Sequence, residues 1–208
     1  VGPSIAAQQA RHVEANPAAA SASVSLNTSI VYLGQASGAL AGGQLRFGSS
    51  PDTYARILEG AKVALAGMPD GQLGVAPHSL RAVSLETLRL VAGMVPTGPV
   101  HIHIAEQVAE VTEVQAAWGA RPVDWALANL PLDQRLCMIH ATQMSPGETT
   151  VLARTGAVAG LCPITEGNLG DGIFNGPDWL AAGGAFGVGS DSNVLISLAE
   201  ELRTLEYS

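Results

Sequence analysis

The stretch "HIHIAEQVAEV", residues 101–111, decides how the rest of the chain is interpreted. Two histidines, His101 and His103, alternate with isoleucines in an apolar run that predicts a strand over residues 99–105. Valines at positions 108, 111 and 114 then recur at helical spacing, which predicts a helix directly after the strand. Glu106 lies in the short connection between the two elements. Ionisable side chains at such a strand end are typical of catalytic sites in α/β enzymes.

The same alternation of a short apolar run and a helix recurs along the chain. The runs are nearly continuous in apolar residues, as expected of parallel strands that are buried on both faces by helices. The predicted strands are residues 29–34, 72–77, 99–105, 135–139, 157–163 and 185–190. The fold class is therefore α/β with a parallel sheet. Residues 1–28 are weakly patterned and are expected to be a leader or loop, so the catalytic domain is placed at residues 29–208.

Helices are predicted between most of these strands. The expected ranges are 51–67, 85–94, a helix from about 108, 145–156, 177–184 and 197–207. Residues 145–156 carry the fullest set of end signals: Ser145 as the N-cap, Pro146 in the first turn, Glu148 three residues after the cap, and Gly156 just past the end.

Composition narrows the class of protein. The 208 residues carry a net charge of −8 and no cluster of Lys and Arg, which argues against a nucleic-acid or anionic-membrane partner. No apolar run approaches the roughly 18 residues of a membrane-spanning helix. Cys137 and Cys162 lie in apolar runs and are expected to be buried free thiols. These features predict a cytoplasmic protein that acts on a small-molecule substrate, with a homodimer left open.

Polar, ionisable residues recur at the carboxyl ends of successive predicted strands. They are His78, His103 with Glu106, His140 and Asp191. In a (β/α)8 barrel of the TIM type these strand ends converge on one mouth, whereas a doubly wound sheet brings only a few of them to one crevice. The fold is therefore predicted to be a (β/α)8 barrel. Imidazole and carboxylate groups suit zinc or iron with a position left open for water.

For three residues near these strand ends, a purely structural role is an alternative to a role in catalysis or binding. His101 is expected to be a core histidine, pointing away from His103 or into a neighbouring layer. Asp191 lies before a predicted helix and could cap it instead of binding a metal. Arg81 could pair with a surface glutamate, or it could anchor a substrate carboxylate.

Six segments together resemble the amidohydrolase superfamily and, more narrowly, the formimidoylglutamate deiminases of bacterial histidine degradation. The resemblance covers residues 29–208 and is dense from residue 72. The segments are "GVAPHSLRAV" (74–83), "HIHIAEQ" (101–107), "IHATQM" (139–144), "GLCPITEGNLGDGIF" (160–174), "GVGSDSNV" (187–194) and "EELRTLEYS" (200–208). It implies a distorted barrel with one catalytic divalent metal, normally Zn²⁺, with Fe²⁺ as the alternative.

The resemblance also implies roles for individual residues. His103 and Asp191 match metal ligands, and Asp191 is also expected to accept a proton in catalysis. Glu106 matches a glutamate that shuttles protons, and His140 matches a histidine that acts beside the metal. His78 and Arg81 match positions that contact substrate, with Arg81 suited to a glutamate carboxylate. Tyr32 is expected to bind substrate.

One part of the family pattern is missing. The family's first strand carries a His-x-His pair of metal ligands, and no such pair precedes residue 29. Only strands three to eight of the barrel are therefore expected, and the chain is expected to be a fragment or part of a longer enzyme.

The implied reaction is metal-dependent hydrolytic deimination of N-formimino-L-glutamate to N-formyl-L-glutamate and ammonia. Two alternatives remain open. The chain could belong to another superfamily deaminase that acts on a heterocycle of the guanine, cytosine or triazine type, or it could be an inactive barrel fragment.

Overall fold

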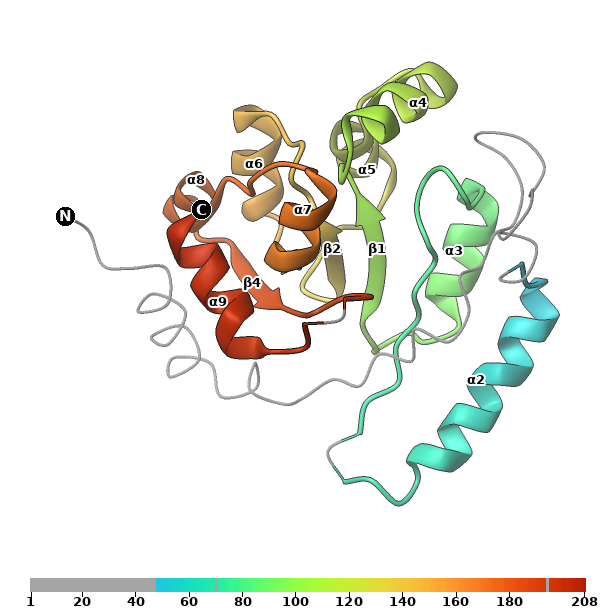
Figure 1. The fold of residues 1–208 in the computed structure, drawn as a ribbon. Helices are drawn as coiled ribbons and strands as arrows, with labels where there is room; N and C mark the ends of the chain where they lie inside the picture. Colours follow the sequence, from blue (N-terminus) through green and yellow to red (C-terminus); the bar gives the residue numbers. More distant parts are fainter. Residues whose placement is uncertain (1–47, 70, 194) are drawn as a thin grey trace.

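Four parallel strands form the sheet at the centre of the molecule (Figure 1). The computed structural model describes residues 48–69, 71–193 and 195–208. The strands are β1 (Val100–Ile104), β2 (Leu136–His140), β3 (Val158–Leu161) and β4 (Ala185–Val188). Each pairs in parallel with the next one along the chain. The predicted α/β class with a parallel sheet is confirmed.

The spatial order of the strands, β1-β2-β3-β4, is the same as their order in the sequence. A doubly wound sheet reverses its strand order at a switch point, whereas successive strands of a (β/α)8 barrel are always neighbours. The observed order therefore agrees with consecutive strands of a barrel. The register pairs Ile104 with His140, so the carboxyl ends of β1 and β2 lie level with each other.

Most of the helices lie around the sheet, whereas α2 lies further out and contacts α3, and we call all the helices the shell (Figure 1). Two of them, α5 and α7, were not predicted, although each begins with a proline in its first turn, which is a helix-start signal. Both are short and follow directly on other elements, so little periodic pattern marks them. The shell consists of α2 (Pro51–Leu65), α3 (Leu85–Gly93), α4 (Val108–Trp118), α5 (Pro122–Asn129), α6 (Pro146–Ala153), α7 (Pro163–Leu169), α8 (Gly176–Ala181) and α9 (Leu198–Tyr207).

The capping signals read from the sequence are present in the structure. The Ser145 hydroxyl accepts a hydrogen bond from the backbone N–H of Glu148 at 3.2 Å, and the Glu148 carboxylate accepts one from the Ser145 N–H at 2.7 Å. This reciprocal pair satisfies two of the donors that a helix start leaves without partners. Gly156, just beyond α6, has a positive φ of 88°, as expected of a residue that ends a helix.

The predicted strand at 72–77 is instead an extended segment held to β1 by two isolated parallel bridges. The bridges pair Val75 with Val100 and Ser79 with His103. Between them lies Pro77, which has no N–H to continue the ladder that the N–H groups of Val75 and His101 begin. Gly74 allows the close approach, because a Cβ there would lie 2.7 Å from the Pro99 carbonyl oxygen.

The two faces of β1 differ in what they bury. Val100, Ile102 and Ile104 are at most 2% exposed and form part of the hydrophobic core. His101 and His103 alternate with them and are half-buried on the opposite face. Residues two apart on a strand share a face, so the alternative that His101 points to the opposite face from His103 is wrong. The other alternative, a neighbouring layer, agrees with its position further from the strand end.

The remaining predictions about fold are partly outside the described residues. The leader at 1–28, the strand at 29–34 and Tyr32 all lie there. Both cysteines are free, as predicted, with Cys162 buried and Cys137 half-buried. None of the helices in the described ranges has the length and apolarity needed to cross a membrane.

Candidate active site

Ionisable side chains from three strand ends meet at one edge of the sheet, which we call the rim (residues 103–106, 140–142 and 191). The ring centroids of His103 and His140 are 5.5 Å apart. The Asp191 Oδ2 atom lies 4.0 Å from His140 Nε2. His78 stacks on His103 with its ring centroid 4.8 Å away. The structure therefore brings together four of the residues that the sequence singled out, from segments far apart in the chain.

His103 is held in an orientation that suits a metal ligand. Its Nδ1 lies 2.8 Å from the backbone carbonyl oxygen of His78, which can only accept a hydrogen bond. Nδ1 therefore carries the proton, and Nε2 keeps its lone pair. Burial lowers the pKa of His103, which favours the neutral imidazole that a metal requires.

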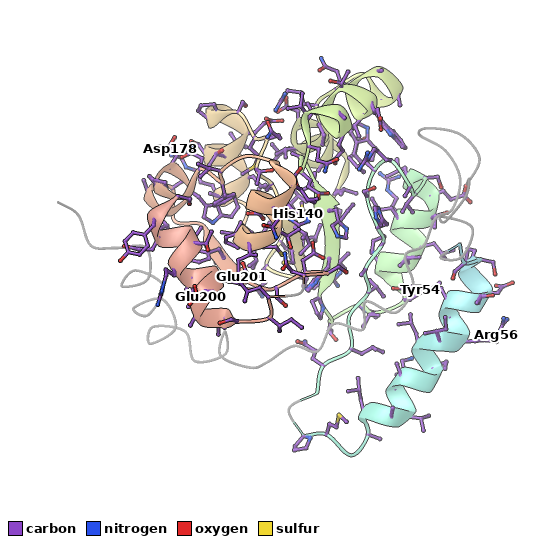
Figure 2. All side chains as sticks on the ribbon, viewed as in Figure 1. Tyr54, Arg56, His140, Asp178, Glu200 and Glu201 are labelled. Carbon is purple, nitrogen blue, oxygen red and sulfur yellow. The ribbon has the colours of Figure 1, made fainter. Side chains whose placement is uncertain are left out.

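His140 lies in the interior of the molecule (Figure 2), with its side chain 1% exposed. Its Nε2 is 3.7 Å from Glu106 Oε1 and 4.0 Å from Asp191 Oδ2. Burial by itself would lower the pKa of His140, but the hydrogen bond with Glu166 and the surrounding carboxylates outweigh it and raise this pKa. His140 Nε2 is thus the point at which two acidic groups of the rim converge.

Glu166, in the first turn of α7, is a site residue that the sequence did not reveal. Its Oε1 is 3.1 Å from His140 Nδ1 and also accepts the backbone N–H of Cys162 at 2.8 Å. Its side chain is 4% exposed. An acidic residue in the first turn of a helix is common on electrostatic grounds alone, so the sequence pattern gave no separate signal for Glu166.

Glu106 is half-buried, and a second glutamate fixes its backbone. Both oxygens of the buried Glu110 carboxylate accept backbone N–H groups, from Ala105 at 3.1 Å and from Glu106 at 2.7 Å. Burial raises the pKa of Glu106, against the opposing influence of His140 and Arg81, and the carboxylates of Asp171 and Glu110 add to the increase. A carboxyl group with a raised pKa is suited to take up and release a proton.

The backbone of the rim is unusual. Four non-glycine residues in the described ranges have positive φ: Ala105 at 48°, His140 at 69°, Ala141 at 54° and Asp191 at 52°. All four lie on the rim. Such conformations cost energy and persist where the surrounding structure imposes them, most often at functional sites.

The structure also decides one alternative for Asp191. Helix α9 begins at Leu198, and the side chain of Ser197 caps it by accepting the N–H of Glu200. The alternative that Asp191 caps this helix is therefore wrong. Asp191 is close enough to His103 to influence its pKa, as expected of two groups on the same rim.

Arg81 lies at the side of the rim and is paired with a glutamate. Its Nη1 is 3.4 Å from Glu113 Oε2 on α4, and the two side chains are 29% and 50% exposed. Arg81 also acts electrostatically on His78, His103 and Glu106. Burial, with His103 and Arg81 adding to it, lowers the pKa of His78 to about 3. The surface ion pair expected as one alternative is thus present, and the guanidinium still lies near the site.

The donor set fits part of a metal site. His103 offers a neutral imidazole nitrogen and Asp191 a carboxylate, and both donor types suit zinc or iron. A second group of potential ligands, His140, Cys162 and Glu166, has donor atoms within 4.8 Å of one another. There the Glu166 oxygen already accepts two hydrogen bonds, and burial raises the pKa of the Cys162 thiol, whose proton a metal would have to displace. We therefore interpret this second group as a hydrogen-bond cluster.

Comparisons with known proteins identify the family of the chain. The model of the amidohydrolase family matches residues 3–206. The formimidoylglutamate deiminase of Pseudomonas aeruginosa is 48% identical over 169 residues, which are 79% of this chain and 36% of that protein. The chain thus spans about a third of the length of this curated relative.

Solved structures show the same fold. An amidohydrolase from Brucella melitensis has a TM-score of 0.81 and 52% identity, covering 86% of this chain and 40% of that one. An adenosine deaminase from Xanthomonas campestris with bound zinc has a TM-score of 0.70 at 23% identity, covering 88% and 39%. The parallel strands β1 to β4 are accordingly part of a (β/α)8 barrel, and the chain belongs to the amidohydrolase family.

Proposed function

We propose that this chain forms part of the catalytic domain of a formimidoylglutamate deiminase, which hydrolyses N-formimino-L-glutamate to N-formyl-L-glutamate and ammonia. The observation that carries the proposal is the convergence of Glu106 and Asp191 on Nε2 of His140, within 3.7 and 4.0 Å. Acid–base groups so close together can move protons to and from one reacting carbon. The 48% identity to the Pseudomonas aeruginosa deiminase supports this substrate.

His103 and Asp191 would hold the metal, together with ligands from outside the described residues. We propose Zn²⁺, with Fe²⁺ as the alternative, because neutral imidazole and carboxylate suit both. When bound, the metal would supply Lewis acidity, which makes water a competent nucleophile near neutral pH.

The side chains of the rim would then divide the proton transfers. Asp191 accepts the proton of the attacking water as the new C–O bond forms at the formimino carbon. His140 accepts this proton from Asp191 on its Nε2 and passes it to Glu106. Glu106, with its raised pKa, protonates the imino nitrogen as the C=N bond becomes single, and protonates it again with the proton received from the water. The remaining hydroxyl proton passes to Asp191 as the C=O bond of the formyl group forms, the C–N bond breaks, and ammonia leaves.

Arg81 would bind a carboxylate of the substrate. A guanidinium matches a carboxylate in geometry and charge. Arg81 lies close enough for its charge to act on the pKa values of His78, His103 and Glu106. His78 lies against His103 and would contact the same end of the substrate. Tyr32, outside the described residues, stays a proposed third contact.

The test is ammonia release by the full-length, metal-loaded protein. Turnover of N-formimino-L-glutamate well above that of guanine, cytosine and triazines is expected. A preference for a heterocycle would favour the alternative deaminase. The adenosine deaminase from Xanthomonas campestris is an example of a protein of this fold that is named for a heterocyclic substrate. Zinc and iron analysis of the same sample distinguishes both from a protein without an intact site.

We also propose that the enzyme works in the cytoplasm on a diffusible substrate. The two cysteines are free, as is usual in proteins of compartments that keep thiols reduced. A homodimer remains a proposal, to be checked by measuring the molecular mass in solution.

A further inference from the structure

The two nitrogens of His140 have different surroundings. Nε2 faces the rim, near Glu106 and Asp191. Nδ1 faces away from the rim, 3.1 Å from the Glu166 carboxylate, and both side chains of this pair are at most 4% exposed. The pair therefore lies behind the catalytic edge, out of contact with solvent.

The position of the Glu166 carboxylate is itself fixed. It extends from the first turn of α7, and its Oε1 accepts the backbone N–H of Cys162 at 2.8 Å. An ionised carboxylate has no proton to donate, so Glu166 can only accept a hydrogen bond from Nδ1. The proton between His140 and Glu166 therefore belongs to the imidazole.

We propose that Glu166 is a positioning residue that keeps the proton on Nδ1 of His140 and so presents Nε2 to the reacting atoms. The kinetic part of this proposal rests on the proposed function. A carboxylate behind a catalytic imidazole selects the tautomer and fixes the plane of the ring. His140 has a positive φ of 69°, which is unfavourable for a residue other than glycine. The hydrogen bond from its ring to Glu166 therefore holds a side chain whose backbone is strained.

The opposite tautomer would harm catalysis at this rim. Nε2 is the nitrogen within 3.7 Å of Glu106 and 4.0 Å of Asp191. If the neutral imidazole carried its proton on Nε2, that nitrogen could no longer accept one. The exchange of protons among the three groups would then be interrupted without any change in where the substrate binds.

The direct test is ¹⁵N NMR of the full-length zinc protein with labelled histidine, at alkaline pH where the imidazole is neutral. His140→Asn assigns the signal. We expect a protonated Nδ1 and an unprotonated Nε2 in the wild type, and a shift towards a protonated Nε2 in Glu166→Ala. A protonated Nε2 in the wild type would overturn the proposal, and so would an unchanged tautomer in Glu166→Ala. The spectrum needs no substrate, so it decides this proposal even if the proposed reaction is wrong.

Kinetics provide the second readout. Glu166→Ala is expected to lower kcat roughly 10- to 100-fold with little change in KM, the range seen when the partner of an active-site histidine is lost. Glu166→Gln keeps an acceptor oxygen, and the Cys162 N–H selects the amide orientation that turns this oxygen towards Nδ1. It should retain the tautomer and stay within about tenfold of wild-type kcat, because a neutral hydrogen bond is about half as strong as a charge-assisted one.

Glu148→Gln is the matched control for the loss of a buried carboxylate. Glu148 lies in the first turn of α6 and forms a salt bridge with Arg121. Its side chain is 2% exposed. This variant is expected to lower stability but to leave the His140 spectrum and kcat unchanged. Equal kcat losses in Glu166→Gln and Glu166→Ala, with wild-type tautomer in both, would mean that Glu166 has a merely structural role.

Discussion

The rim and the shell differ in which residue types adopt left-handed backbone conformations. In the shell, glycines occupy the left-handed conformations that end helices, as Gly119 does after α4 and Gly170 after α7. On the rim, alanine, histidine and aspartate occupy the same region of φ. The shell follows local conformational preferences, whereas the rim departs from them in order to aim side chains. Strain of this kind is tolerated because the surrounding structure imposes it, as the two Glu110 hydrogen bonds to residues 105 and 106 illustrate.

This difference predicts that substitutions on the rim change chemistry and substitutions in the shell change stability. The largest effect is expected for Glu106→Gln. Removing the proton carrier should lower kcat roughly 10²- to 10⁴-fold, because general acid–base catalysis contributes that much. Turnover and metal content should be measured together, and zinc content is expected to be unchanged. Full turnover in this variant would contradict the role of Glu106.

Arg81→Ala should mainly raise KM for N-formimino-L-glutamate. Loss of a charge-assisted hydrogen bond of roughly 1.5–3 kcal/mol corresponds to about a 10- to 100-fold loss in kcat/KM. Initial-rate kinetics on this substrate would measure it. Glu113→Gln removes the partner of Arg81 but leaves the guanidinium, so a much smaller effect is expected. Equal rates for wild type and Arg81→Ala would instead favour a heterocyclic substrate, which needs no carboxylate anchor.

Ser145→Ala tests the shell. It removes the acceptor for the Glu148 N–H at the start of α6 and should lower the free energy of unfolding by about 1 kcal/mol. Denaturant unfolding measures this loss, and kcat at a temperature where the protein is folded should equal that of the wild type. A drop in kcat of the folded protein would mean that the shell and the rim are not separable in this way.

The smallest effect is expected for Tyr54→Phe, also in the shell. The buried Tyr54 hydroxyl accepts the N–H of Ala76 at 3.1 Å, and its loss should cost roughly 0.5–1 kcal/mol at neutral pH. Burial raises the pKa of Tyr54 above its ordinary 10.0, despite the opposing hydrogen bond. The unfolded chain therefore loses this proton first, so the contribution of Tyr54 is present below pH 10 and declines as pH rises beyond it. Unfolding measured between pH 8 and 11 should show a flatter decline in the variant, and parallel curves would refute the assignment.

Much of the shell could be predicted from local sequence because helix ends carry local chemistry. Ser84 and Ser145 cap α3 and α6, as predicted, through hydrogen bonds that span only three residues. Ser197 caps α9 in the same way, although the sequence had offered Asp191 as the cap of that helix. The extended segment at 72–79 was overestimated as a strand, since apolar content does not reveal that Pro77 interrupts its hydrogen bonding. Helices α5 and α7 were missed because they are too short to show a period.

The sequence by itself determined the α/β class, the parallel strands and the placement of His103, Glu106, His140 and Asp191 at or just beyond strand ends, whereas His78 follows an extended segment instead of a strand. It could do so because short apolar runs and the polar residues that follow them are local properties of the chain. Only the tertiary structure decided which atoms meet: Glu166 with His140 across 26 residues, Arg81 with Glu113 across 32, and His103 with the carbonyl of His78 across 25. These contacts depend on how parallel strands align in register and how helices pack over them, and no pattern of neighbouring residues encodes that alignment.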